Sequence, residues 1–211
     1  MVSRNLAEHV SLARRVYDEL ADNYEQLYPV RQHRARERVN RLNDYVVHAG
    51  RALDVGCGPG LVLRALIDAG FHATGIDVSP RMVEFARLRA ATADVRVGDF
   101  LSSEFGAQFD VVIADAFLHL YPHEAAAQIF ERLLGALSRP GVISCSTTVS
   151  ARIDAGFTPK ADYPGSPIRY RTQWTVDAFR SLFESAGVRI VDSYEVRDNN
   201  KVWQVVSGVH E

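Results

Sequence analysis

The chain has 211 residues, 47% of them hydrophobic and 24% charged, and a formal net charge of −2 at pH 7. These values are ordinary for a globular domain, and the charge gives no overall attraction to nucleic acid or to an anionic membrane. No apolar run approaches the ~20 residues of a membrane span, the N-terminus lacks a signal-peptide core, and the two cysteines suggest no disulfide framework, so we expect a cytoplasmic protein.

Two helices are predicted at the N-terminal end. The first contains apolar residues near helical spacing, namely Leu6, Val10, Ala13, Val16, Tyr17 and Leu20. The second runs from about Val30 to Val47, with a break around Pro29 and a stop at Gly50. Arginines spread over several faces of this second helix, with Glu37 among them, so a solvated surface is expected for Arg31, Arg34, Arg36, Arg38 and Arg41.

Strands and helices then alternate with short connections from residue 51 to about 149. The expected strands lie at residues 52–55, 72–76, 95–97, 109–115 and 142–148, and the expected helices at residues 61–69, from 81, and 125–137. This alternation predicts a doubly wound α/β domain with a parallel sheet.

The pattern dissolves between Ser150 and Gln173, where three prolines and two glycines occur. A structureless connection of this length is uncommon unless it is a lid or a binding loop, so residues 150–174 are expected to be a substrate lid. A helix capped by Thr175 (residues 176–186) and two strands (188–196 and 202–209) follow, with a hairpin turn at residues 198–200. We therefore expect a single domain over residues 1–211, with a helical cap (1–50), a core (51–149), the lid (150–174) and a terminal helix and hairpin (175–211).

The most informative segment is the turn after the first strand, Asp54-Val55-Gly56-Cys57-Gly58-Pro59-Gly60. Missing Cβ atoms let a ligand approach such a strand-to-helix turn, and free N–H groups at a helix start favour an anionic or polar ligand. The spacing is G-x-G-x-G, which differs from the G-x-G-x-x-G of dinucleotide-binding turns. Cys57 stands where a small side chain is required, so steric fit explains it better than thiol reactivity.

Polar residues also follow the next strands in order. Asp77 ends the second strand, Gly98-Asp99-Phe100 follow the third, and Asp115 ends the fourth. A carboxylate at the tip of the second strand can accept hydrogen bonds from both hydroxyls of a ribose. A helix-capping role would fall more naturally to Ser79.

Together these segments resemble motif I and the following strand ends of class I S-adenosylmethionine (SAM) methyltransferases. The resemblance covers roughly residues 15–209, and its specific part is residues 52–119. It implies a seven-stranded, Rossmann-like sheet that is parallel except for a C-terminal antiparallel hairpin. It also implies SAM as cofactor, with S-adenosylhomocysteine as product, and a cofactor site formed by Tyr24, Asp54, Gly56, Cys57, Gly58, Gly60, Asp77, Val78, Met82, Gly98, Asp99, Phe100 and Ala114.

The roles of three of these residues have plain structural alternatives. Met82 can be a core residue of its helix, Asp99 can start a loop, and Tyr24 can be a core aromatic. In the family, a tyrosine near this place closes over the amino-acid end of SAM.

The segment after the fourth strand supplies the candidate catalytic residue. His119 is expected to act as a base or to orient the acceptor, and the alternative is a packed histidine bonded to backbone. His119 and His123 have a helical metal-ligand spacing, but Pro122 lies between them and no third ligand is near, so no metal is expected.

The acceptor site is expected to include Tyr28, His119, Arg169, Tyr170 and Arg171. A guanidinium of Arg169 or Arg171 can bind a carboxylate, phosphate or phosphonate bidentately, and the alternative is a pair of surface arginines on a mobile loop.

The predicted function is methyl transfer from SAM to a small molecule, first of all to an oxygen. N-methylation of a small amine or amino sugar and a non-catalytic SAM-binding partner subunit are the alternatives. An RNA or protein methyltransferase would usually add a basic groove or a recognition domain, and a nicotinamide-dependent dehydrogenase does not fit the glycine spacing. A monomer or a homodimer is expected.

Overall fold

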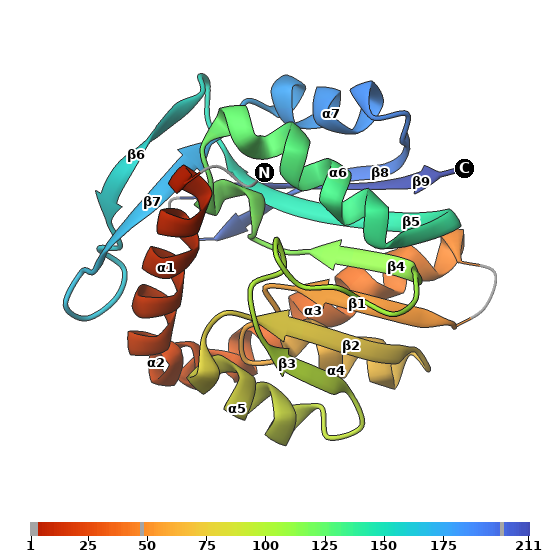
Figure 1. Ribbon diagram of the computed structural model, residues 1–211, viewed down its shortest axis with the longest axis horizontal. Coiled ribbons are helices and arrows are strands. Elements are labelled where there is room, and N and C mark those ends of the chain that lie inside the picture. Colours follow the sequence, from red (N-terminus) through yellow and green to blue (C-terminus); the bar gives the residue numbers. More distant parts are fainter. Residues whose placement is uncertain (1–3, 47–48, 199–200) are drawn as a thin grey trace.

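The computed structural model describes residues 4–46, 49–198 and 201–211 and shows a central sheet with helices on both faces (Figure 1). The sheet has seven strands in the order β3-β2-β1-β4-β5-β9-β8. Their bounds are β1 Arg51–Val55, β2 His72–Asp77, β3 Asp94–Val97, β4 Phe109–Ala114, β5 Leu137–Val149, β8 Arg189–Asp198 and β9 Lys201–His210. Strands β1 to β5 pair in parallel, whereas β9 is antiparallel to both β5 and β8. The predicted fold class is confirmed.

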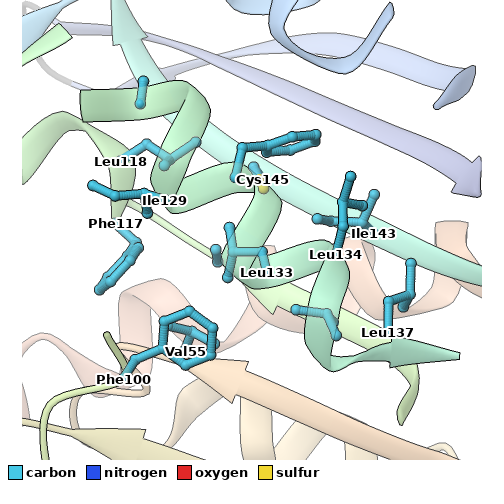
Figure 2. Close-up of a cluster of buried hydrophobic side chains, with 14 of the residues drawn as sticks. Val55, Phe100, Phe117, Leu118, Ile129, Leu133, Leu134, Leu137, Ile143 and Cys145 are labelled. Atoms are coloured by element: carbon cyan, nitrogen blue, oxygen red, sulfur yellow. The ribbon is translucent and has the colours of Figure 1, made fainter. Parts of the chain in front are cut away.

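Each face of the sheet has its own apolar core, because the parallel strands are buried on both sides. On one face lie α3 (Tyr28–Leu42), α4 (Leu61–Asp68) and α5 (Pro80–Arg89), which contribute Val39, Leu63 and Val83. On the other face lie α6 (Ala126–Ala136) and α7 (Val176–Ser185), which contribute Phe130 and Phe183. Figure 2 shows the second core around Ile129, Leu133 and Ile143. The carboxyl ends of β1, β2 and β4 therefore sit on a rigid, doubly covered frame.

The N-terminal cap has one more break than predicted. Helix α1 (Arg4–Glu19) is followed by α2 (Ala21–Gln26) and then by α3, so the chain bends at Leu20 and Leu27. Pro29 lies in the first turn of α3, where its missing N–H costs no intrahelical hydrogen bond. The short 3₁₀ helix η1 (Asn43–Tyr45) ends this segment before the predicted end at Val47, which is outside the described residues.

The segment predicted to be a structureless lid is instead a β-hairpin. Strands β6 (Asp154–Pro159) and β7 (Ile168–Gln173) pair with Phe157 opposite Tyr170, and Figure 1 shows them beside α1. Trp174 anchors the hairpin, because its N–H donates to Thr148 O over 3.0 Å and its carbonyl accepts from Ser150 N over 2.8 Å. Most of the prolines and glycines of this segment lie in the connection between the two strands. Their frequency in the sequence concealed the strand pattern on either side of the connection. The predicted β8–β9 turn has only Asp198 among the described residues.

Candidate active site

One cavity of about 280 Å³ lies at the carboxyl ends of β1, β2, β3, β4 and β5, where open α/β sheets bind ligands. Its walls also include α2, α3, the connection between β6 and β7, and β9. Most of the predicted site residues line it, namely Tyr24, Asp54, Gly56, Cys57, Gly58, Asp77, Val78, Met82, Gly98, Asp99, Phe100, His119 and Arg169.

The N–H groups of the three glycines and of Cys57 are engaged within the fold, whereas the helix start that was expected to offer free N–H groups lies at Leu61 and Val62, which line the cavity. Gly56 N and Cys57 N both donate to Ile76 O, over 2.9 and 3.1 Å, and Gly58 N donates to Asp77 Oδ2 over 2.9 Å. Gly60 N donates to Cys57 O over 3.0 Å. The turn is therefore tied to β2, and it can offer a ligand its bare Cα surfaces and carbonyl oxygens.

The glycines of this turn serve different purposes. Gly58 has φ +50°, and a Cβ built there meets no atom within 4 Å, so its bare face opens into the cavity. Gly60 has φ +82°, and a Cβ there would come within 2.8 Å of Ala86 Cα on α5. Gly60 does not line the cavity, and a glycine is required at this position by the close packing of α4 on α5. The expectation that Gly60 cradles the ligand is not supported.

Asp77 has both carboxylate oxygens engaged by backbone, Oδ2 with Gly58 N and Oδ1 with Ser79 N, each over 2.9 Å. Burial raises the pKa of this carboxyl, and the two N–H groups oppose that shift. Since each oxygen has a second lone pair, Asp77 can still accept hydrogen bonds from a ligand in the cavity. Ser79, as expected, caps α5 by accepting from Met82 N over 3.1 Å.

At the end of β3, Gly98, Asp99 and Phe100 form the adjoining wall, with Met82 and Val78 beside them. Asp99 Oδ1 accepts from Leu101 N over 2.9 Å, so the carboxylate also organises its own loop. Ala114 does not line the cavity and lies fully buried in the core, which corrects its assignment to the ligand site. The Cys57 thiol is buried, and burial raises its pKa well above the usual value, which fits a packing role.

A polar network missed by the sequence reasoning joins α3 to the ends of β1 and β4. Arg38 is 7% exposed, and its Nη2 lies 2.9 Å from Asp115 Oδ1, which also accepts from Ser146 Oγ. Ser146 Oγ in turn accepts from Ala116 N, over 3.0 Å, and holds Ala116 at φ +54°. Such a left-handed non-glycine residue is strained and needs this support.

Asp54 lies beside this network. Burial raises the pKa of its carboxyl, the neighbouring Asp115 raises it further, and Arg38 opposes the shift. Asp54 Oδ2 and Arg38 Nη1 have no hydrogen-bond partner among the described residues. Arg31, Arg34 and Arg38 all line the cavity, and the expectation of a solvated surface is wrong for the buried Arg38, whereas Arg31 and Arg34 are partly exposed. Their spacing of three and four places them on one helical face, which was a usable signal.

His119 lies in the 3₁₀ helix η2 (Leu118–Leu120), is 3% exposed, and packs edge-on to Trp203 at 5.5 Å between ring centroids. Burial lowers the pKa of its imidazole well below the usual value, and the cations of Arg169, Arg171 and Lys160 lower it further. His119 Nδ1 has no hydrogen-bond partner among the described residues. A neutral imidazole facing a cavity can accept a hydrogen bond or a proton, so it suits both the acceptor-orienting role and that of a base.

Of the three residues predicted in the late segment, only Arg169 lines the cavity. Tyr170 points to the other face of β7, where its ring meets His9 at 4.3 Å and Phe157 at 5.3 Å. Arg171 donates from Nε to Thr148 Oγ1 over 3.2 Å. The side chain of Tyr28 lies outside the described residues. Tyr170 is therefore corrected to a packing residue, because side chains alternate along a strand.

Lys160 and an aromatic group complete the wall near Arg169. Lys160 Nζ lies 4.3 Å from the ring centre of Tyr163, which stacks on Tyr24 at 5.1 Å. Burial and the nearby Arg169 lower the pKa of Lys160 to about 7. Sequence reasoning missed Lys160, because nothing local distinguishes it from an exposed loop lysine.

Neither a metal site nor a membrane-crossing helix is found in residues 4–46, 49–198 and 201–211. No group of three His, Cys, Asp or Glu side chains is placed to hold a metal ion there. His123 packs on Trp174 with 4.5 Å between ring centroids. No helix in these ranges is long and apolar enough to cross a membrane.

Comparisons with known proteins agree with this fold. Residues 52–141 match the methyltransferase domain family. The ubiquinone biosynthesis O-methyltransferase of Methylocella silvestris is 35% identical over 106 residues, which are 47% of this chain and 40% of that protein. The corresponding enzyme of Bordetella parapertussis is 34% identical over 97 residues, 43% of this chain and 39% of that protein. The chain thus matches less than half the length of these curated relatives.

Solved structures extend the similarity to the whole fold. The 1,6-didemethyltoxoflavin-N1-methyltransferase of Burkholderia thailandensis, solved with its substrate and S-adenosylhomocysteine, gives a TM-score of 0.78 at 16% identity and covers 99% of this chain and 91% of that chain. Magnesium protoporphyrin IX methyltransferase of Synechocystis PCC 6803, solved with SAM, gives a TM-score of 0.66 at 20% identity. The match covers 85% of this chain and 79% of that chain. Residues 52–141 thus resemble the methyltransferase domain family, and the whole chain has the fold of methyltransferases solved with SAM or S-adenosylhomocysteine, as its glycine turn predicted.

Proposed function

We propose that the protein transfers a methyl group from SAM to a small-molecule acceptor, with an oxygen as the first candidate. The observation that carries this proposal is the single cavity wall that joins Asp54, Gly58, Asp77 and Asp99 to His119. The matched relatives in ubiquinone biosynthesis are O-methyltransferases, which supports oxygen. N-methylation is the second candidate, supported by the N1-methyltransferase fold neighbour.

The residues present fit a SAM molecule. The open face at Gly58 is a cradle that a Cβ would fill, and Asp77 keeps free lone pairs for ribose hydroxyls. The unpartnered Asp54 Oδ2 and Arg38 Nη1 lie together and have complementary charges for the ammonium and carboxylate of an amino acid. Phe100 and Met82 supply apolar walls for adenine next to Asp99. When bound, SAM supplies an electrophilic methyl group on a sulfonium.

The protein's own part is to position, to exclude water and to handle a proton. Holding nucleophile and methyl in line can supply roughly 7–11 kcal/mol of the barrier. The buried His119 accepts a hydrogen bond from the acceptor and fixes its orientation. We infer a single-domain, cytoplasmic enzyme, monomeric or homodimeric, that acts on neither nucleic acid nor membrane.

Calorimetric titration with SAM, S-adenosylhomocysteine and NAD tests the cofactor assignment. Micromolar binding of the two adenosyl compounds and no binding of NAD is expected. Asp77→Asn should weaken SAM binding at least tenfold, whereas Asp94→Asn, an exposed carboxylate on the edge strand paired with Arg96, serves as a matched control. Absence of SAM binding by the folded wild-type protein would overturn the proposal.

Turnover separates an enzyme from a non-catalytic partner subunit. Hydroxyl, amine and oxyacid acceptors are incubated with SAM, and S-adenosylhomocysteine is quantified with the methylated product. Tight SAM binding without product from any class would favour the partner-subunit alternative.

A further inference from the structure

The far end of the cavity holds two buried cationic side chains, Arg169 and Lys160, that form no ion pair within the described part of the chain. Arg169 is 5% exposed, and its Nε and Nη1 have no hydrogen-bond partner among the described residues. Lys160 is 6% exposed, and in the same part of the chain no ion pair to it is found. Buried charged groups are normally paired, because leaving water without a partner costs several kcal/mol. An unpaired buried arginine that lines a cavity therefore indicates a missing anion.

The other charges around this end are already engaged. Lys201 Nζ lies 2.7 Å from Asp162 Oδ2, and Arg171 Nε donates to Thr148 Oγ1. Arg31 Nη2 donates to the Tyr163 hydroxyl over 3.2 Å. Asp162 is thus paired with Lys201, and Arg169 and Lys160 are available to bind a ligand.

The surroundings of Arg169 and Lys160 favour the acceptor over the cofactor at this end, because both cations, with Lys201 of β9, lie close enough to His119 to lower the pKa of its imidazole. The ribose and adenine candidates, Asp77 and Asp99, follow β2 and β3, whereas Lys201 and Trp203 lie on β9. Strand β9 is four positions from β2 in the sheet, and at about 4.8 Å per strand this separation is roughly 19 Å. Arg38, beside Asp54 and Asp115, lies between these ends and suits the cofactor's carboxylate.

We propose that Arg169 and Lys160 form a subsite for an anionic group, a carboxylate, phosphate or phosphonate, carried by the methyl acceptor. This inference rests on the proposed function and names its acceptor class as small acids. Tyr24, Tyr163 and Trp203 supply apolar walls beside the two cations. Burial lowers the pKa of Lys160, the cations Arg169, Lys201 and Arg31 lower it further, and the carboxylate of Asp162 opposes the shift. Binding an anion reverses this balance and draws a proton onto Lys160.

Calorimetry with three model ligands tests the subsite without turnover. Benzoate, phenylphosphonate and the neutral benzamide are titrated into the wild-type protein saturated with S-adenosylhomocysteine, or alone if that compound does not bind. The two anions should bind at least tenfold more tightly than benzamide. Titration at pH 7.5 in two buffers of different ionisation enthalpy should show proton uptake for the anions.

Three variants test which residues bind the anion. Arg169→Met and Lys160→Met should each lower anion affinity at least fivefold, and Lys160→Met should abolish the proton uptake. Arg152→Met, an exposed arginine just before β6, is the control and should change neither. SAM affinity of Arg169→Met should stay within threefold of the wild type.

Two outcomes would overturn the subsite. Equal affinity for benzoate and benzamide would mean that the cations do not select charge. A tenfold loss of SAM affinity in Arg169→Met, with anion binding unchanged, would assign Arg169 to the cofactor's carboxylate. Failure to bind SAM would instead overturn the proposed function, because the anion measurements do not need the cofactor.

Discussion

At the scale of single residues, burial decides what the candidate side chains can do. His119 and Asp54 are both withdrawn from water, so each disfavours its charged form, and the pKa shifts run in opposite directions. His119 is therefore neutral at physiological pH. Asp54 has one oxygen without a partner until a ligand supplies a donor.

The neutral state of His119 gives a first prediction. Because its pKa is lowered well below 6.5, protonation of His119 should cause no inflection in kcat/KM between pH 6.5 and 8. His119→Gln should lower kcat about tenfold or more at saturating SAM, with SAM affinity unchanged. A wild-type inflection near pH 7 that disappears in His119→Gln would contradict the neutral state of His119.

At the scale of elements, close contacts between two helices and between a helix and a strand fix the positions of the helices around the cavity. Helix α4 packs on α5 at Gly60, and α3 is joined to the end of β4 by the pair of Arg38 and Asp115. Both contacts lie next to the proposed cofactor site. The effects of a substitution on folding stability and on SAM binding can therefore be separated only by comparing matched variants.

Two glycine variants make that separation. Gly60→Ala should lower the free energy of unfolding by about 2–4 kcal/mol, because it places a Cβ 2.8 Å from Ala86 Cα at a positive φ. Gly58→Ala should cost about 1 kcal/mol, for the positive φ alone, but should weaken SAM binding at least tenfold by filling the cradle. Urea unfolding and calorimetry measure the two effects. The reverse pattern would contradict the assignment of the two glycines.

The ion pair between α3 and β4 gives a third prediction. Arg38→Met should lower stability by about 1–3 kcal/mol, because Asp115 is partly exposed while Asp54 is buried and loses its only nearby cation. SAM affinity should fall as well if Arg38 binds the cofactor's carboxylate. Arg36→Met is the control, since Arg36 is exposed and its carboxylate partner Asp68 is 3.6 Å away. Equal stability of the two variants would show that the pair is not structural.

At the scale of the whole molecule, the sheet and the cap together enclose a site with an unbalanced buried charge. Strands β6 and β7 bring Lys160 and Arg169 over the end of β5, and α2 and α3 complete the wall. This unbalanced buried charge lowers the stability of the folded protein, as expected where function and folding compete.

That cost should depend on pH. The pKa of Lys160 falls from 10.5 to about 7 on folding, so between these values the unfolded chain binds more protons than the folded one. The contribution of Lys160 to the free energy of unfolding should therefore rise with pH from 7 to 10.5, by up to about 1.4 kcal/mol per pH unit. Lys160→Met should remove this rise and be the more stable protein at pH 7. Urea unfolding of both proteins at pH 7, 8 and 9 measures the difference, and parallel curves would contradict it.

The sequence by itself determined the sheet and the class of fold, and it indicated strand-end residues that line one end of the cavity. Period-2 and period-3.6 patterns and strand-end residues such as Asp77 and Asp99 are local signals that do not need the rest of the chain. It did not reveal the surroundings of Gly60 and Ala114, which come from α5 and the core, or the hairpin within residues 150–174, where proline and glycine concealed the strand pattern.

Only the tertiary structure decided the acceptor end. Whether Arg38 and Arg169 are solvated or buried, and whether Tyr170 faces the cavity, depends on contacts between segments that are far apart in the sequence, such as Arg38 with Asp115 and His9 with Tyr170. The N–H groups of the glycine turn are likewise bonded to β2, which no local pattern reveals. Burial and pairing of charges are properties of the assembled fold, because they depend on which surfaces meet.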